Sequence, residues 1–246
     1  MRITLFVLST FLLRAQAQAP PQDVAPPRVH MLDPLARMVN DYGNTARYAA
    51  ENAKVLPPAV GEDRVVFMGD SITDGWGRGL GVFFPGKPYI NRGIGGQVTP
   101  QMLLRFHQDV IALKPKAVVI LAGTNDIGGN VGPMTLEATE DYFLSMIDMA
   151  RANNIRVVLS SVMPVCDYIR PQTAQRSPEK ILALNRWLKD YAEKNNCVYL
   201  DYFSAMADEK GMFRKDLTYD GLHPNAAGYE VMGPLAEKAI AQALAQ

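Results

Sequence analysis

Short apolar runs alternate with longer amphipathic stretches along most of the chain. Runs rich in Val, Ile and Leu predict five buried strands, at residues 64–68, 89–92, 117–122, 156–163 and 198–201. Stretches with helical period or composition predict five helices, at residues 35–53, 100–111, 136–153, 178–195 and 226–245. Strand and helix therefore alternate.

Alternation of helices with almost entirely apolar strands predicts an α/β fold. Parallel strands need long connections, and such strands are buried on both faces by crossover helices. We therefore expect a three-layer α/β/α sandwich around a central, mostly five-stranded parallel sheet. With 246 residues, 48% of them hydrophobic and 20% charged, the chain can build one sizeable core, so residues 31–246 are predicted to form one domain. Ligands in such sheets bind beyond the carboxyl ends of the strands.

The start of the chain has the pattern of an export signal. Met1 and Arg2 precede an apolar run at residues 3–13, which predicts a signal peptide over residues 1–19. This run is well short of the roughly 20 apolar residues that a membrane-spanning helix needs, so no stable membrane anchor is expected. Four prolines then favour an extended linker over residues 20–30. These features predict a periplasmic or extracellular protein.

Charge and cysteine content exclude several classes of partner. The 25 basic residues balance the 25 acidic ones, so no strong field favours nucleic acid or an anionic membrane. Cys166 and Cys197 fall at opposite edges of the predicted sheet, and we expect two unpaired thiols. The carboxylates are scattered and no H-E-x-x-H motif occurs, so neither a metal site nor a cofactor is predicted.

Three residues could supply the chemistry of a serine hydrolase. Ser71 follows the first predicted strand in Gly69-Asp70-Ser71, and Asp220 stands three residues before His223, close enough to orient its ring. A serine hydroxyl needs an imidazole to take its proton and a carboxylate to fix the imidazole tautomer. Alternatively, Ser71 is a structural turn residue and Asp220 caps the last helix, as Asn225 could also do.

Acyl transfer also requires donors for the oxyanion that develops in the transition state. The glycine turn that follows the second strand ends at Gly96, and its backbone N–H is a candidate donor. This turn lacks the G-x-G-x-x-G spacing of a dinucleotide site, which argues against a phosphate-binding loop. Asn125 follows the third strand in Gly123-Thr124-Asn125-Asp126 and offers a side-chain amide, although it could instead cap a helix.

These four segments together, in this order and spacing, resemble the signature blocks of the GDSL, or SGNH, hydrolases, whose fold is flavodoxin-like. The resemblance covers residues from about 62 to 240. It implies that Ser71 is the nucleophile, His223 the base and Asp220 its partner. It also implies an oxyanion hole made of the Ser71 N–H, the Gly96 N–H and the Asn125 side chain.

The substrate is less constrained by these motifs. Trp76, Tyr202 and Tyr219 are predicted in or beside loops that follow strands, where aromatic faces suit sugar rings, and with Asp70 they are the candidate substrate-binding residues. Tyr168 is a further aromatic of this kind, and each of these rings could instead pack in the core. Export and resemblance to secreted bacterial members favour acetyl esters of carbohydrates. The alternatives are a lipid-directed acylhydrolase, lysophospholipase or thioesterase, and a noncatalytic carbohydrate-binding protein.

Overall fold

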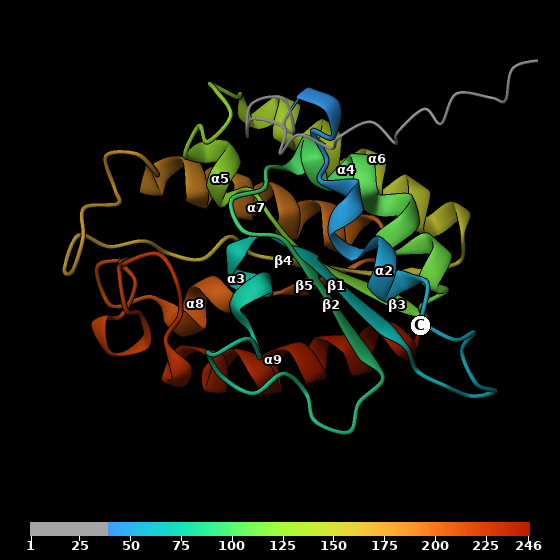
Figure 1. Cartoon of the computed structure of the whole chain (residues 1–246). Helices are drawn as coiled ribbons and strands as arrows, with labels where there is room; N and C mark the ends of the chain where they lie inside the picture. The colour runs from blue at the N-terminus through green and yellow to red at the C-terminus, as the bar shows by residue number, and fades with distance from the viewer. Residues whose placement is uncertain (1–38) are drawn as a thin grey trace, which may run out of the picture.

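Five parallel strands form one sheet at the centre of the computed structural model, which describes residues 39–246 (Figure 1). The strand order is β2-β1-β3-β4-β5. Their bounds are β1 Val65–Gly69, β2 Tyr89–Gly93, β3 Ala117–Leu121, β4 Arg156–Ser160 and β5 Val198–Leu200. Every residue of β1 and β3 is buried, as expected for central strands covered on both faces.

Helices cover both faces of the sheet, which confirms the expected three layers. In Figure 1, α4 (Thr99–Asp109), α6 (Leu136–Ala152) and α7 (Pro178–Lys194) lie on one side of the strands. The long helix α9 (Ala226–Leu244) and the short helix α8 (Tyr202–Met206) lie on the other. Among the described residues, 3-10 turns lie at Thr45–Tyr48, Ile111–Leu113 and Lys215–Leu217.

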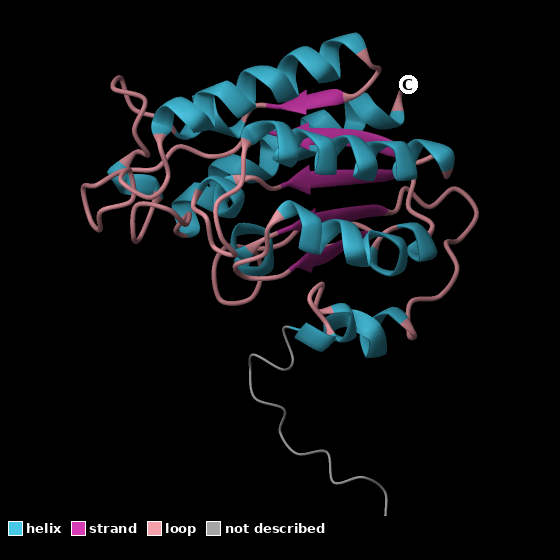
Figure 2. Ribbon diagram, turned by 90° about the horizontal axis from the view of Figure 1, so that it is seen from above, coloured by secondary structure: helices cyan, strands magenta, loops and turns pink. Residues whose placement is uncertain are grey.

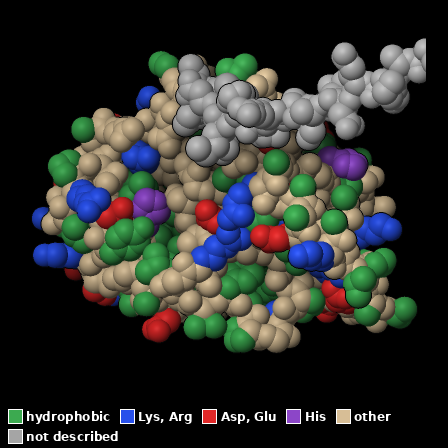
Figure 3. Space-filling model, viewed as in Figure 1, with side chains coloured by type: hydrophobic (Ala, Val, Ile, Leu, Met, Phe, Trp, Pro, Cys, Tyr) green, Lys and Arg blue, Asp and Glu red, His purple; other side chains and the backbone are tan. Residues whose placement is uncertain are grey.

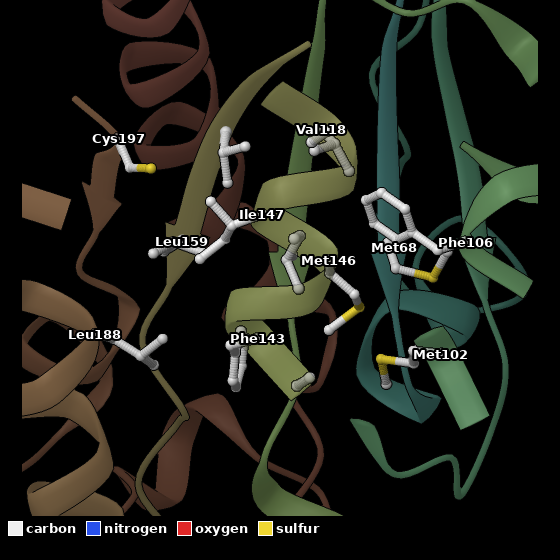
Figure 4. Close-up of a cluster of buried hydrophobic side chains, with 14 of the residues drawn as sticks. Met68, Met102, Phe106, Val118, Phe143, Met146, Ile147, Leu159, Leu188 and Cys197 are labelled. Atoms are coloured by element: carbon white, nitrogen blue, oxygen red, sulfur yellow. The ribbon is translucent and has the colours of Figure 1, made fainter. Parts of the chain in front are cut away.

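Each helical layer buries an apolar stripe against the sheet. Figure 4 shows the layer of α4, α6 and α7, where large side chains from the helices meet aliphatic residues of the strands. Burial of each such side chain stabilises the fold by about 1.5–3 kcal/mol. The helix residues labelled there are Met102, Phe106, Phe143, Met146, Ile147 and Leu188, and they pack on a sheet face that includes Met68, Val118 and Leu159.

The strand register brings three loops to one edge of the sheet. Gly69 at the end of β1 lies beside Gly93 of β2 and Leu121 of β3. Figure 2, seen from above, shows the five strands side by side and pointing the same way. The segments that begin with Asp70, Ile94 and Ala122 therefore leave the sheet at the same level.

One predicted helix is wrong. The expected continuous helix at residues 35–53 is broken in its described part: residues 39–40 are helical, a turn follows at residues 41–44, and a 3-10 turn at Thr45–Tyr48 leads into the short helix α2 (Ala49–Asn52). Asn44 adopts a left-handed conformation with φ of 51°, which interrupts a right-handed helix. The carboxylate of Asp41 accepts the backbone N–H of Thr45 and stabilises this turn.

The structure adds short helices directly after strands where the sequence predicts turns or loops. These are α3 (Ser71–Gly75), α5 (Thr124–Ile127) and α8, each too short to show a hydrophobic period. The predicted strand at residues 156–163 also ends earlier, at Ser160, because its neighbour β5 ends at Leu200.

The two cysteines are free and buried, as expected. Cys166 packs in the hydrophobic cluster that includes residues of α9, whereas Cys197 packs in the cluster of α4, α6 and α7. Their side chains thus belong to opposite faces of the sheet, which prevents a disulfide.

The expectations for the start of the chain concern a signal peptide at residues 1–19 and a linker at residues 20–30. Both segments lie outside the described residues. Among the helices that the structure describes, none combines the length and apolar character needed to cross a bilayer.

Candidate functional site

The end of β1 delivers Ser71 to the carboxyl edge of the sheet. Asp70 caps helix α3, because its carboxylate accepts the N–H of Ile72 at 2.9 Å. Gly69 allows the abrupt change from strand to helix, since a Cβ at this position would lie 2.1 Å from Thr73 Oγ1. The half-buried Ser71 therefore stands at the start of the helix, where its backbone N–H has no intrahelical acceptor.

Ser71, His223 and Asp220 form a continuous hydrogen-bonded chain. Ser71 Oγ lies 2.9 Å from His223 Nε2, and His223 Nδ1 lies 2.8 Å from Asp220 Oδ2. The other oxygen of Asp220 accepts the backbone N–H groups of Leu222 at 3.0 Å and of His223 at 2.8 Å. This geometry is the one required for an imidazole to remove a proton from a serine hydroxyl.

The environment of Asp220 keeps its carboxyl ionised. Burial raises the pKa of this group, but the hydrogen bonds from the backbone and ring of His223 and from the Leu222 N–H outweigh burial and lower the pKa below its ordinary value. An ionised carboxylate at this position holds the His223 ring in one orientation and would stabilise its protonated form.

A tight loop presents His223 to the serine. Thr218 Oγ1 donates to the His223 carbonyl at 2.6 Å and accepts the N–H of Gly221 at 3.0 Å. Gly221 has a φ of 90°, and a Cβ there would lie 2.5 Å from the carbonyl oxygen of Cys166. Asn225 then caps α9 by accepting the N–H of Gly228. Glycine at 221 is thus needed both for the backbone conformation and for the close approach of the neighbouring loop.

The glycine turn after β2 lies beside the serine. A Cβ on Gly95 would be 3.8 Å from Ser71 Cβ, and the Gly95 N–H donates to Asp74 Oδ2 at 3.2 Å. Gly96 is exposed and has a φ of 78°, and its carbonyl accepts from Asn130 Nδ2 at 3.3 Å. Among the described residues the Gly96 N–H has no intramolecular acceptor, so it is free to bind a ligand.

The Asn125 amide lies beside Asp70 and Gln97, and its hydrogen bonds fix its orientation. Its Nδ2 donates to the Gln97 carbonyl at 3.0 Å and lies 3.5 Å from Asp70 Oδ2. Its Oδ1 accepts from Asn130 Nδ2 at 2.9 Å and from the Arg176 guanidinium at 3.3 Å. The long contact to Asp70 leaves one N–H of Asn125 weakly held and able to serve an oxyanion.

Three of the four candidate substrate-binding residues are buried, which contradicts that assignment. Asp70, Trp76 and Tyr202 are 0%, 3% and 1% exposed. Trp76 and Tyr202 lie at or on the short helices after β1 and β5, which direct them into the core. The Trp76 ring packs against Phe67, Phe83, Phe84 and Tyr229.

Tyr219 differs from these residues because it is 49% exposed. Its ring stacks on the His223 imidazole with centroids 5.6 Å apart and planes inclined by 10°. Tyr168 is also exposed, at 43%, and its hydroxyl donates to Asp208 at 2.7 Å. Of the predicted aromatics, Tyr219 is therefore the one whose ring contacts His223.

Arg176 is a buried residue of this site that sequence reasoning missed. It is 6% exposed, and its guanidinium donates to the side-chain oxygens of Asn125, Gln172 and Gln175. The sequence carries no signal for it, because an arginine in a polar segment between a strand and a helix is ordinarily exposed.

The other histidines and the acidic residues suggest no second centre. His107 lies on α4, and His30 is outside the described residues. Within residues 39–246, His, Cys, Asp and Glu side chains form no group of three or more that could hold a metal ion. Figure 3 shows acidic and basic side chains interspersed with hydrophobic ones over the visible face.

Asp70→Asn should change how stability depends on pH. Burial raises the pKa of Asp70 from 3.8 to about 7, so the folded state binds this proton more tightly than the unfolded chain does. Stability from this group is full at about pH 4 and declines as the pH rises towards 7, by up to about 4 kcal/mol at 1.36 kcal/mol per unit. Asparagine keeps the helix cap but has no proton to lose.

Urea unfolding of the full chain between pH 4 and pH 8 tests this prediction. The Asp70→Asn variant should gain stability relative to wild type as the pH rises, whereas Asp148→Asn, on the exposed face of α6, should not. Parallel pH profiles for wild type and Asp70→Asn would refute the expected titration.

The sequence is similar to that of known hydrolases. The sequence model of the GDSL-like lipase/acylhydrolase family matches residues 67–231. A crystal structure of a GDSL-like lipase from Bacteroides thetaiotaomicron is 41% identical, with a TM-score of 0.77 over 82% of this chain and 99% of that one.

Two curated proteins are more distant. An acetylxylan esterase from Geobacillus stearothermophilus is 25% identical over 201 residues, covering 69% of this chain and 90% of that protein. A lipoprotein of Bacillus subtilis is 28% identical over 114 residues, covering 42% of this chain and 46% of its own.

Proposed function

Because the chain belongs to the GDSL-like lipase/acylhydrolase family, we propose that it is a serine esterase that hydrolyses acetyl and other short acyl esters. The observation that carries the proposal is the hydrogen-bonded chain from Ser71 Oγ through His223 to Asp220. A noncatalytic carbohydrate-binding protein would have no need of this alignment. Family membership itself supports hydrolase activity.

The proposed reaction has two steps. His223 Nε2 takes the hydroxyl proton as Ser71 Oγ attacks the ester carbonyl, and the imidazolium then gives that proton to the departing alcohol. Water next attacks the acyl-serine and loses a proton to His223, and the proton returns to Ser71 as the carboxylic acid leaves. Asp220 fixes the ring and stabilises its charged form in both steps.

The proposed oxyanion hole consists of the Ser71 N–H, the Gly96 N–H and the Asn125 amide. The first lies at a helix start and the second has no acceptor among the described residues. The third is oriented by bonds to both of its polar atoms. Donors that are fixed before reaction stabilise the developing charge without reorganisation.

The proposed substrates are acetylated carbohydrates. One curated relative is an acetylxylan esterase, at 25% identity. The exposed ring of Tyr219 beside His223 offers an apolar face of the kind that packs against a sugar. A lipid-directed acylhydrolase, lysophospholipase or thioesterase is the second candidate, since family members include lipases.

A panel of p-nitrophenyl esters from acetate to palmitate, run beside acetate release from acetylated xylan, tests the substrate class. We expect kcat/KM to be highest for acetate, and acetate to be released from the xylan. A preference for long chains would favour the lipid-directed candidate, and inactivity on every ester would contradict the proposed function.

Tyr219→Ala in the same panel tests the sugar-binding role. The variant should raise KM for acetylated xylan by about 3- to 10-fold, the effect of losing an aromatic contact worth about 0.5–1.5 kcal/mol. Tyr219→Phe should retain wild-type KM, because the ring face is kept. An equal effect of Tyr219→Ala on p-nitrophenyl acetate would instead indicate a role in orienting His223.

We also propose that the chain is exported, on the basis of the signal-like pattern at residues 1–19. N-terminal sequencing of the protein recovered from a bacterial periplasm or culture medium should then begin near residue 20. Full-length chain confined to the cytosol would contradict export.

A further inference from the structure

Arg176 is a buried cation in contact with the proposed oxyanion hole. It belongs to the segment that joins β4 to α7 and is 6% exposed. One side of its guanidinium donates to Asn125 Oδ1 at 3.3 Å and to Asn130 Oδ1 at 3.5 Å. The other side donates to Gln172 Oε1 at 3.3 Å and Gln175 Oε1 at 3.2 Å.

All four acceptors are neutral amides, which is unusual for a desolvated arginine. Among the described residues no carboxylate lies within ion-pair distance of Arg176, and its Nε has no hydrogen-bond partner. Burial lowers the pKa of Arg176, while the more distant Asp70 and Asp220 raise it, and a guanidinium stays charged in proteins. Its positive charge is therefore not neutralised by a direct partner.

The contacts to Asn125 determine which way its amide faces. An arginine can only donate hydrogen bonds, so the Asn125 atom that it contacts must be the oxygen. Rotating the amide by half a turn would place an N–H group against the guanidinium and leave the Gln97 carbonyl without its donor. Arg176, together with Asn130, thus holds the Asn125 Nδ2 towards the Gln97 carbonyl and Asp70, the residue that precedes Ser71.

Gly128, which follows the last residue of α5, leaves room for this guanidinium. A Cβ on Gly128 would lie 3.1 Å from Arg176 Cζ and 3.2 Å from its Nη2. Gly128 has a φ of −70°, a backbone conformation that alanine adopts readily. A Cβ at position 128 would therefore crowd the guanidinium, and it would also lie 3.1 Å from the Thr124 carbonyl oxygen.

We propose that Arg176 is a positioning residue for ester hydrolysis: it fixes the Asn125 amide towards the oxyanion, and its unneutralised charge favours the negative charge that develops there. The inference rests on the proposed function and extends it to a residue outside the signature blocks. Preorganised positive charge in a site shielded from water strongly stabilises a transition-state anion. Its removal should therefore affect kcat more than KM.

The first test measures kcat and KM for p-nitrophenyl acetate with full-length variants. Arg176→Gln should lower kcat by about 10- to 100-fold and change KM by less than about 2-fold. Arg176→Lys keeps the charge with fewer donors and should recover part of the loss. Gly128→Ala leaves Arg176 in place, with its charge and all its donors, but displaces the guanidinium. This variant should lower kcat to a value between that of wild type and that of Arg176→Gln. Arg186→Gln, on the exposed face of α7, is the charge-matched control and should match wild type.

The second test asks whether Arg176 acts through Asn125. In an Asn125→Ala background, Arg176→Gln should lower kcat by a clearly smaller factor than in wild type, because the amide it positions is absent and only the effect of its charge remains. A boronic acid that forms an anionic tetrahedral adduct with Ser71 should bind Arg176→Gln more weakly, by a factor close to the loss in kcat. A purely structural role would not produce this match.

Several results would overturn the inference. Wild-type kcat in both Arg176→Gln and Gly128→Ala would overturn it. So would a loss of kcat on Arg176→Gln that is as large in the Asn125→Ala background as in wild type. If Arg176→Gln does not fold, unchanged kcat and boronic acid affinity in folded Gly128→Ala would overturn it. An inactive wild type would overturn the proposed function itself, whereas an active wild type with unaffected variants would overturn the role of Arg176 alone.

Discussion

Ser71→Ala should lower kcat for p-nitrophenyl acetate by about 10,000-fold or more, because the variant loses the atom that forms the acyl intermediate. KM should change little, since the hydroxyl contributes a single hydrogen bond, to His223. The free energy of unfolding should change by no more than about 1 kcal/mol, as is usual for loss of one partly exposed hydroxyl. Steady-state kinetics and urea unfolding measure these quantities.

Ser145→Ala is the matched control for this variant. Ser145 is also half-buried, and its hydroxyl donates one hydrogen bond to the Asp141 carbonyl at 2.9 Å, but it lies on α6 and away from the site. The control should keep wild-type kcat. A fluorophosphonate should add covalently to wild type at Ser71 and not to Ser71→Ala. Undiminished turnover by Ser71→Ala would exclude this residue as the nucleophile.

Asp220→Asn should lower kcat by about 1,000- to 10,000-fold, with a smaller change in KM. The asparagine Oδ1 can still accept the N–H groups of Leu222 and His223. Its NH2 group, however, would face His223 Nδ1 and favour the tautomer that carries the proton on Nε2. That tautomer cannot accept the proton of Ser71, so the nucleophile is not activated.

Asp216→Asn is the control for Asp220→Asn. Asp216 lies in the same segment and pairs with Arg214 at the surface, 2.7 Å away. Its replacement should leave kcat unchanged, since exposed ion pairs contribute little. If Asp220→Asn kept more than about a tenth of wild-type kcat while remaining folded, Asp220 would not be the residue that orients His223.

The α/β fold could be predicted because its signals are local in the sequence. The apolar runs of β1 and β3 are buried on both faces and therefore lack polar positions, which separates them from the amphipathic helices. The helix at residues 35–53 was wrong because composition does not reveal that Asn44 adopts a left-handed conformation. That conformation depends on local hydrogen bonds that Asp41 accepts from Asn44 and Thr45, and on contacts with distant residues such as Gln108.

The candidate site was predictable to different degrees. Asp220 and His223 are three residues apart, so their pairing follows from local geometry. Whether Trp76, Tyr202 and Tyr219 are buried or exposed did not follow from sequence, since each is an aromatic near the end of a strand or within a loop. Two of them are buried and one is exposed. The direction of a short helix, set by the surfaces that it packs against, decides between the two outcomes.

The sequence by itself determined the order of strands and helices and the types of reactive group, because hydrophobic period and short motifs are properties of neighbouring residues. Only the tertiary structure brought Ser71 to His223 across 152 positions and Arg176 to Asn125 across 51. Contacts of this kind depend on sheet order, register and loop packing. Those features arise when the whole chain buries its apolar surface, and no local pattern encodes them.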